Sequence, residues 1–265
     1  MRALLLLLPL VVVWGCRSAE VASSPPDDRE PEQGEQESRA ATALAAAAWQ
    51  PTTFEVGRSV NGSPIEAVLL GGDRQKPVVL MLAGLHGDEQ SGTPLLRRLE
   101  RHLTEHPGLL EERAVLLIPI ANPDGFEQGS RHNARGIDLN RNFPASNFEP
   151  SRRRGQTPLS EPESQALFSL LHSILPVRVV SIHMAASLVD FDGPAAALAQ
   201  AMSAHCRLPA RRLGNRLGSL GSYVGADLAT PIITLELTAG DRALAEEELW
   251  ERYGEALLEA IRWPL

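Results

Sequence analysis

The sequence predicts an α/β fold, with a mixed, largely parallel central sheet and helices on both faces. Apolar runs of strand length alternate with amphipathic segments of helix length between residues 49 and 265. The runs 77–82 and 114–120 are apolar throughout, which indicates strands covered on both faces. Histidines and carboxylates follow the ends of several runs, the position where open α/β sheets bind their ligands.

The composition agrees with one sizeable soluble domain plus additional segments. The chain has 265 residues, of which 43% are hydrophobic and 22% are charged. Its net charge of −8 gives no indication of nucleic-acid binding. We expect a monomeric protein.

Residues 1–16 are typical of a lipoprotein-type signal peptide. Arg2 precedes an apolar run at 4–14 that is too short to span a bilayer but suits the central region of an export signal. The run ends in Val13-Trp14-Gly15-Cys16, which resembles the lipobox of bacterial lipoproteins, in which the cysteine is lipidated and becomes the new N-terminus. The alternative is an ordinary secretory signal with an incidental cysteine. Both interpretations predict export, and the first predicts a lipid-anchored protein that faces the periplasm or the cell exterior.

Residues 17–48 form a predicted disordered linker that is rich in acidic residues, proline and alanine. The segment has no apolar periodicity to bury. The folded domain is therefore expected at 49–265. Its single cysteine, Cys206, is predicted to be a small buried hydrophobic residue.

The predicted elements begin with strands at 52–60 and 63–70, joined at Asn61-Gly62, which is a strong hairpin signal. A helix is expected to start near Pro158–Glu163, with Ser160 as its cap, Pro162 in the first turn and Glu163 completing a capping box. The other predicted elements are strands at 77–82, 114–120, 177–183 and 231–237 and helices at 89–102, 194–205 and 244–263.

Three strand ends carry candidate functional side chains. His86 and Glu89 follow the strand at 77–82 and lie one helical turn apart, so both can face one metal ion. Alone, this pair is more often a solvated first turn of a helix. His183 ends another strand, where the alternative is a core histidine bonded to a carbonyl. Glu236 ends a third, where the alternative is a pair with an arginine.

The long polar segment 122–144 supplies cations. Its three arginines, with several asparagines, can bind a carboxylate through bidentate donors. The alternative is a solvated surface loop. The arginines are Arg131, Arg135 and Arg141.

Four ordered motifs resemble the zinc carboxypeptidases of the M14 type over roughly residues 50–265. They are His86-x-x-Glu89, Asn122-Pro-Asp-Gly125, Asp138-Leu-Asn-Arg-Asn142 and Ser181-Ile-His183. The segments 86–89, 158–163, 218–223 and 232–236 further resemble the murein peptide amidase branch. That branch hydrolyses the bond between γ-D-glutamate and diaminopimelate in cell-wall peptides.

The resemblance implies a zinc carboxypeptidase-like fold and a role for each site residue. By it, His86, Glu89 and His183 ligate Zn²⁺. Glu236 is then the general base, and Arg131 stabilises the developing oxyanion.

The resemblance also implies the substrate contacts. Asn140 and Arg141 would hold the free carboxylate of the substrate, and Tyr223 would cap the bound substrate. Asp88 departs from the digestive carboxypeptidases, which carry an arginine at that motif position, so a subsite contact is lost or changed. Asp190 and Asp192 have two interpretations, contact with a substrate ammonium or, more commonly, a capped turn before Pro194.

The predicted function is hydrolysis of a peptide-type amide next to a free carboxylate, in a peptide or murein-peptide substrate. One alternative is an N-acyl amino acid deacylase of the aspartoacylase kind, which uses a similar zinc site. The other is an inactive, lipid-tethered peptidoglycan-binding module. A complete ligand set together with Glu236 argues against the inactive module, because binding alone needs no base.

Overall fold

The computed structural model describes residues 50–72, 76–214 and 216–265. The predicted signal peptide, with Cys16, and the predicted linker lie outside these ranges. Among the helices that are described, none combines the length and apolar character needed to cross a bilayer.

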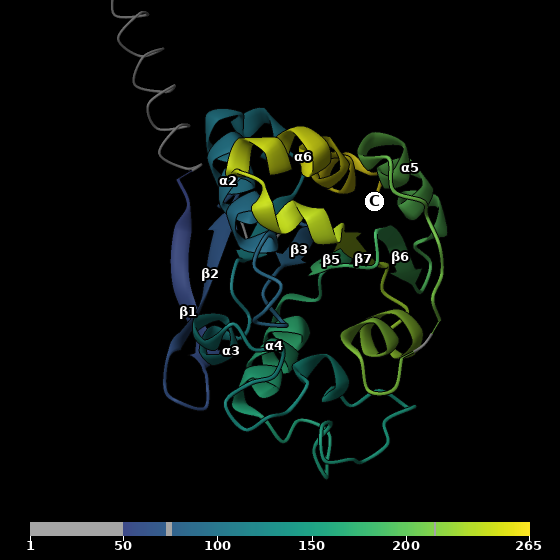
Figure 1. Cartoon of the computed structure of the whole chain (residues 1–265). Coiled ribbons are helices and arrows are strands. Elements are labelled where there is room, and N and C mark those ends of the chain that lie inside the picture. Colours follow the sequence, from purple (N-terminus) through teal and green to yellow (C-terminus); the bar gives the residue numbers. More distant parts are fainter. Residues whose placement is uncertain (1–49, 73–75, 215) are drawn as a thin grey trace, which may run out of the picture. The chain divides into compact units, whose positions relative to one another are not determined.

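Seven strands form one mixed sheet in the order β1-β2-β4-β3-β5-β7-β6 (Figure 1). The four strands β4, β3, β5 and β7 are parallel, and antiparallel strands complete both edges. The predicted mixed, largely parallel sheet is confirmed. The strands are β1 Thr52–Arg58, β2 Pro64–Leu70, β3 Val78–Leu82, β4 Ala114–Ile118, β5 Arg178–Met184, β6 Leu188–Asp192 and β7 Ile232–Leu237.

Helices cover both faces of the sheet, as predicted. In Figure 1, α2, α5 and α6 lie on the upper face and α4 lies below. The four longest helices of the described residues are α2 Gly92–Glu105, α4 Pro162–Ile174, α5 Ala196–Cys206 and α6 Glu246–Arg262. The shorter helical segments are η1 Pro107–Leu110, α3 Pro123–Gln128, η2 Leu139–Arg141, the π-helix η3 Ser222–Asp227 and η4 Ala239–Ala243.

Strand β3 shows why both faces are apolar. Val79 and Met81 pack into the core under α2, α5 and α6, whereas Val78, Leu80 and Leu82 pack into the core beside α4. Alternate side chains of a strand point to opposite faces, so a strand buried on both sides must be apolar throughout. Cys206 is buried in the first core and is a free thiol, as predicted.

The order of strands creates a switch point between β3 and β5. The chain leaves β3 for β4 on one side, and β5 lies on the other side of β3. Ligands of open α/β sheets bind outside the carboxyl ends of the strands at such a point. His86 follows β3 and His183 lies on β5, so both reach this edge of the sheet.

Three local predictions are wrong. Asp190 and Asp192 lie on the edge strand β6, which pairs antiparallel with β7, and not in a capped turn. Ser160 does not cap α4: Glu161 occupies the N-cap position, and Ser160 Oγ bonds to the carboxylate of Glu161. Glu163 does not complete a capping box: its carboxylate accepts from Val60 N at 3.0 Å, and the N–H of the N-cap residue Glu161 donates to Asn142 Oδ1.

Candidate metal centre and active site

A tight turn after β3 carries His86 and Glu89. Helix α2 begins only at Gly92, so the two side chains converge through a turn in which Glu89 N donates to His86 O, and not along a helix. Gly87 permits this turn, because a Cβ there would lie 1.9 Å from the carbonyl carbon of Gly125. The His86 turn therefore packs directly on the backbone of Asn122-Pro-Asp-Gly125.

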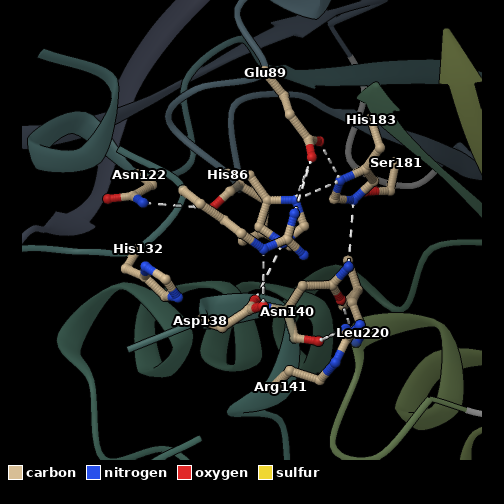
Figure 2. A network of polar contacts seen from close by, with 12 residues as sticks. His86, Glu89, Asn122, His132, Asp138, Asn140, Arg141, Ser181, His183 and Leu220 are labelled. Carbon is tan, nitrogen blue, oxygen red and sulfur yellow. Dashed lines mark hydrogen bonds and ion pairs between the residues drawn. The ribbon is translucent and has the colours of Figure 1, made fainter. Parts of the chain in front are cut away.

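His86, Glu89 and His183 point at one another (Figure 2). His86 Nδ1 lies 2.9 Å from Glu89 Oε1, and His183 Nδ1 lies 2.8 Å from Glu89 Oε2. The two Nδ1 atoms are 3.1 Å apart. All three side chains are buried. The structure thus brings the three predicted ligands together.

Outer contacts fix the orientation of each ligand. His86 Nε2 donates to Asp138 Oδ1 at 3.1 Å, so that the neutral ring would offer the lone pair of Nδ1 to a metal ion at the centre. His183 Nε2 lies 3.0 Å from Ser181 Oγ. Met184 N donates to Glu89 Oε2 at 3.1 Å. Histidine ligands of metals are usually held by such second contacts, which set the tautomer and the ring orientation.

The electrostatics of the cluster favour a charged imidazole at His86 and ionised carboxylates at Glu89 and Asp138. Burial lowers the pKa of His86, but hydrogen bonds to Asp138 and Glu89 outweigh it, so the pKa of His86 is raised overall. Burial also acts to raise the pKa of Glu89, but hydrogen bonds to His183 and His86 hold that pKa well below its usual range. The pKa of Asp138 is lowered as well, because its bond to His86 outweighs its burial.

The donor set fits a divalent metal ion. The ligand atoms of His86, Glu89 and His183 all lie within 4.8 Å of one another. Two imidazole nitrogens and a carboxylate are the protein ligands of many catalytic zinc sites, which leave one position open for water. Without an ion, Glu89 can accept hydrogen bonds from the Nδ1 atoms of both rings, and a divalent cation can take the place of those protons.

Glu236 lies beside this cluster on β7. Its Cα pairs with that of His183 across the two parallel strands, and its carboxylate lines the same cavity as His86 and Glu89. Ala186 N lies 3.4 Å from Glu236 Oε2. Burial raises the pKa of Glu236, His183 lowers it, and the negative charge of Glu89 raises it further, so the net pKa is raised. A raised pKa suits a carboxylate that must accept and return a proton.

Three predicted residues of the long loop also line this cavity: Arg131, Asn140 and Arg141. Arg131 Nη1 donates to Glu89 Oε1 and its Nε donates to Asp138 Oδ2, both at 3.2 Å. Asn140 Oδ1 accepts from Leu220 N at 3.0 Å. The cavity has a volume of about 290 Å³.

Tyr223 is not brought to the cavity. It lies in the π-helix η3, and only 6% of its surface is exposed. Its hydroxyl lies 2.7 Å from His172 Nε2, and its ring lies near Phe143 and Phe168 in the core beside α4. Its contacts are those of a core residue, so we do not retain it as a substrate contact.

Two residues of the sequence motifs, Asp124 and Asn142, have structural roles that the sequence did not indicate. Asp124, within Asn122–Gly125, is buried and accepts from Ser59 Oγ at 2.7 Å and Asn61 N at 3.0 Å. Asn142 is fully buried, and its carboxamide accepts from Ser164 Oγ and donates to Arg154 O. A polar residue with a close, satisfied buried network serves the fold, and no local pattern distinguishes it from a ligand.

Comparison with known proteins agrees with this geometry. Residues 42–197 match the family model described as zinc carboxypeptidase (Peptidase_M14). The chain belongs to the zinc carboxypeptidase family. As a member of this family, whose enzymes depend on zinc, it is a hydrolase of the metallocarboxypeptidase kind.

Individual relatives match most of this chain. Murein peptide amidase A of Escherichia coli K12 is 35% identical over 234 residues, which cover 82% of this chain and 92% of that protein. The crystal structure of murein-tripeptide amidase MpaA from Escherichia coli O157 matches with a TM-score of 0.64 and 30% identity, covering 84% of this chain and 96% of that one. Carboxypeptidase A from Helicoverpa armigera shares the zinc carboxypeptidase fold, with a TM-score of 0.66 at 20% identity, covering 88% of this chain and 72% of that one.

Proposed function

We propose that this protein is a zinc-dependent amidase that hydrolyses the bond between γ-D-glutamate and diaminopimelate in murein peptides. The observation that carries the proposal is that two of the three candidate metal ligands, a half-buried glutamate and an arginine line one cavity. These are represented by His86, Glu89, Glu236 and Arg141. The similarity to murein peptide amidase A over most of both chains supports the choice of substrate.

The chemistry that Zn²⁺ supplies when held by His86, Glu89 and His183 is polarisation of the scissile carbonyl and a lowered pKa of the attacking water. Glu236 takes the proton of that water and returns it to the leaving amine. Arg131, held toward the centre by Glu89 and Asp138, donates to the oxygen that becomes negative. Arg141 and Asn140 bind the carboxylate next to the scissile bond and so orient the amide.

The central test is an assay of the zinc-loaded protein on two substrates in parallel. L-Ala-γ-D-Glu-diaminopimelate should be cut with release of free diaminopimelate, and an N-acetyl amino acid should be cut far more slowly. Preference for the N-acetyl amino acid would instead identify a deacylase of the aspartoacylase kind. Absence of cleavage of both substrates by fully loaded protein would favour the inactive binding module.

A second assay tests the carboxylate contact. Amidation of the diaminopimelate carboxylate next to the scissile bond leaves the cation of Arg141 desolvated and unpaired, which costs about 2–5 kcal/mol. The amidated tripeptide should be cut at least roughly thirtyfold more slowly, the low end of that penalty. Arg141→Ala should remove most of this discrimination, mainly through KM. Equal kcat/KM for both tripeptides with the unmutated protein would contradict the contact.

We further propose that the protein is exported and anchored through a lipid on Cys16, which matches a substrate in the cell wall. Cys16→Ser should yield uncleaved or soluble protein where the unmutated chain partitions into detergent. Unchanged partitioning would favour an ordinary secretory signal.

A further inference from the structure

Three charged residues line the cavity without a role in the reaction described above. They are Asp190, Asp192 and Arg216. Glu89 is assigned to the metal, Glu236 to proton transfer, Arg131 to the oxyanion and Arg141 to the substrate carboxylate. The cavity therefore keeps two carboxylates and one guanidinium for another part of the substrate.

Asp192 is the strongest indication of a ligand group. Only 5% of its surface is exposed, and its Oδ1 has no hydrogen-bond partner among the described residues. The nearest cation, Arg212 Nη2, lies 3.8 Å from that oxygen, which is too far for a hydrogen bond, and its side chain is 54% exposed. A buried carboxylate oxygen without a donor is costly, so a donor from a bound molecule is expected.

Asp190 adds a second negative charge and positions the segment that carries Arg216. Its Oδ1 accepts from Phe191 N and Leu213 N, both at 2.8 Å. Burial raises the pKa of Asp192, and the neighbouring Asp190 raises it further. A cation bound in the cavity next to both carboxylates would offset their mutual repulsion.

Gly221 leaves room for the carboxylate of Asp192 in the wall of the cavity. It lines the cavity, and a Cβ at this position would lie 2.7 Å from Asp192 Oδ2. A side chain here would crowd the carboxylate and displace it.

The strand register places Asp190 and Asp192 at increasing distance from Glu236. Across β6 and β7, Glu236 pairs with Leu188, Thr234 with Asp190, and Ile232 with Asp192. Side chains two residues apart share one face, and each such step advances about 7 Å along the strand. Asp190 and Asp192 therefore lie on the same face of the sheet as Glu236, one and two such steps away from it.

We propose that Asp192, Asp190 and Arg216 form a subsite for an amino-acid group, an ammonium and a carboxylate on one carbon, at the far end of the leaving residue. This proposal rests on the proposed function, and it names the residues that select diaminopimelate. Asp192 and Asp190 bind the distal ammonium, and Arg216 binds the distal carboxylate. In diaminopimelate, four bonds separate the carbon that carries the scissile amide from the carbon that carries the distal ammonium and carboxylate.

The presence of Arg216 distinguishes this subsite from a simple lysine pocket. A lysine side chain presents an ammonium and no carboxylate, so it would leave the guanidinium without its anion. A chain ending only in a carboxylate would leave Asp192 without its donor. Only a residue with both groups satisfies all three charged side chains.

The test compares three tripeptides, L-Ala-γ-D-Glu-X, in which X is diaminopimelate, lysine or 2-aminopimelate. All three keep the scissile amide and the adjacent carboxylate, and the last two each lack one distal group. The zinc-loaded protein should show a kcat/KM for diaminopimelate at least tenfold above both others. Equal values for diaminopimelate and 2-aminopimelate would overturn the ammonium contact.

Variants assign the two contacts separately. Asp192→Asn should lower kcat/KM at least tenfold for diaminopimelate and lysine, with less than a twofold change for 2-aminopimelate. Arg216→Gln should reduce the preference for diaminopimelate over lysine to less than threefold. Arg211→Gln is the matched control, because Arg211 is exposed in the same segment and does not line the cavity. It should leave all three ratios unchanged.

Gly221→Ala keeps every charge and displaces the carboxylate of Asp192, so it should reproduce the pattern of Asp192→Asn if that variant fails to fold. An unchanged substrate preference in Gly221→Ala and Asp192→Asn would refute the subsite.

Binding of the free amino acids separates this proposal from the proposed function. Calorimetry on the zinc-loaded protein should rank diaminopimelate at least tenfold above lysine and 2-aminopimelate. A protein that cuts none of the tripeptides yet keeps this ranking would refute the proposed function and support the subsite. Equal cleavage of all three tripeptides with equal binding would support the amidase and refute the subsite.

Discussion

The five residues from Asp138 to Asn142 send their side chains to different tasks. Asp138 bonds to the ring of His86, whereas Asn140 and Arg141 line the cavity. Leu139 and Asn142 are fully buried in the protein interior. The short 3₁₀ turn at Leu139–Arg141 makes this division possible, because it rotates successive side chains to different sides. One motif thus couples metal-ligand orientation to substrate binding.

Glu236→Gln provides the residue-scale prediction. Its carboxylate lies outside the three converging ligands, and the one hydrogen bond given for it, from Ala186 N, is long at 3.4 Å. The variant should therefore keep its fold, metal content and substrate affinity, while kcat falls by about 10²–10⁴ through loss of the general base. Metal analysis and steady-state kinetics on the murein tripeptide are the measurements. Turnover close to that of the unmutated protein would assign the base to another group.

Sequence reasoning predicted the site residues that follow strand ends. His86, His183 and Glu236 could be proposed because an ionisable residue at the end of an apolar strand is costly without a partner. The role of Asp138 could not, because its contact with His86 joins residues that are 52 positions apart. Asp192 was given the wrong local structure, because its strand β6 has only five residues, Leu-Val-Asp-Phe-Asp, and the turn signal Gly193-Pro194 follows it directly.

At the scale of elements, the metal turn depends on contact between two backbones. Gly87 cannot carry a side chain because its Cβ would lie 1.9 Å from the carbonyl carbon of Gly125, and Gly125 cannot because its Cβ would lie 2.3 Å from Asn122 Nδ2. Asn122 in turn accepts from Gly125 N through its Oδ1 and caps α3. The two motifs therefore position each other, although 35 residues lie between His86 and Asn122.

Gly87→Ala tests this contact. The added methyl group meets backbone and not a flexible side chain, so the turn must shift and move His86 and Glu89. We expect a loss of about 1–3 kcal/mol in the free energy of unfolding, the usual cost of overpacking, together with weaker zinc binding. Chemical denaturation and zinc titration measure the two effects.

Gly108→Ala is the matched control, because the nearest atom to its Cβ would lie 3.9 Å away on the flexible end of Glu111. It should change stability by no more than about 0.5 kcal/mol. Equal stability and zinc affinity in both variants would show that the turn tolerates displacement.

The elements themselves were largely predictable, and the exceptions have identifiable causes. Fully apolar strands and amphipathic helices follow from periodicity alone, so β3, β4, β5 and β7 lie close to their predicted positions. Helix α4 begins later than its capping signal suggested, because Asn142, 19 residues upstream, accepts from Glu161 N and takes over that task. The π-helix at Ser222–Asp227 has no sequence signal that distinguishes it from a loop.

At the scale of the whole molecule, the fold does not depend on the metal site. Two hydrophobic cores cover the two faces of the sheet, and the three ligands lie at its carboxyl edge. Small zinc domains differ, because they lack such cores and unfold without the metal. We therefore expect the metal-free protein to remain folded, with the metal adding stability by mass action.

Chelation measures this contribution. At free Zn²⁺ a thousandfold above its Kd, binding adds about 4 kcal/mol to the free energy of unfolding. For a domain of this size that corresponds to a fall in Tm on the order of 10 °C when zinc is removed. His183→Ala should show the same reduced Tm with or without added zinc, because one ligand of three is gone. Scanning calorimetry with and without chelator, combined with far-ultraviolet circular dichroism, tests both statements. Loss of the cooperative transition on chelation would mean that the ion is needed to hold the sheet edge together, since Glu89 would then be unable to satisfy both histidines by hydrogen bonding alone.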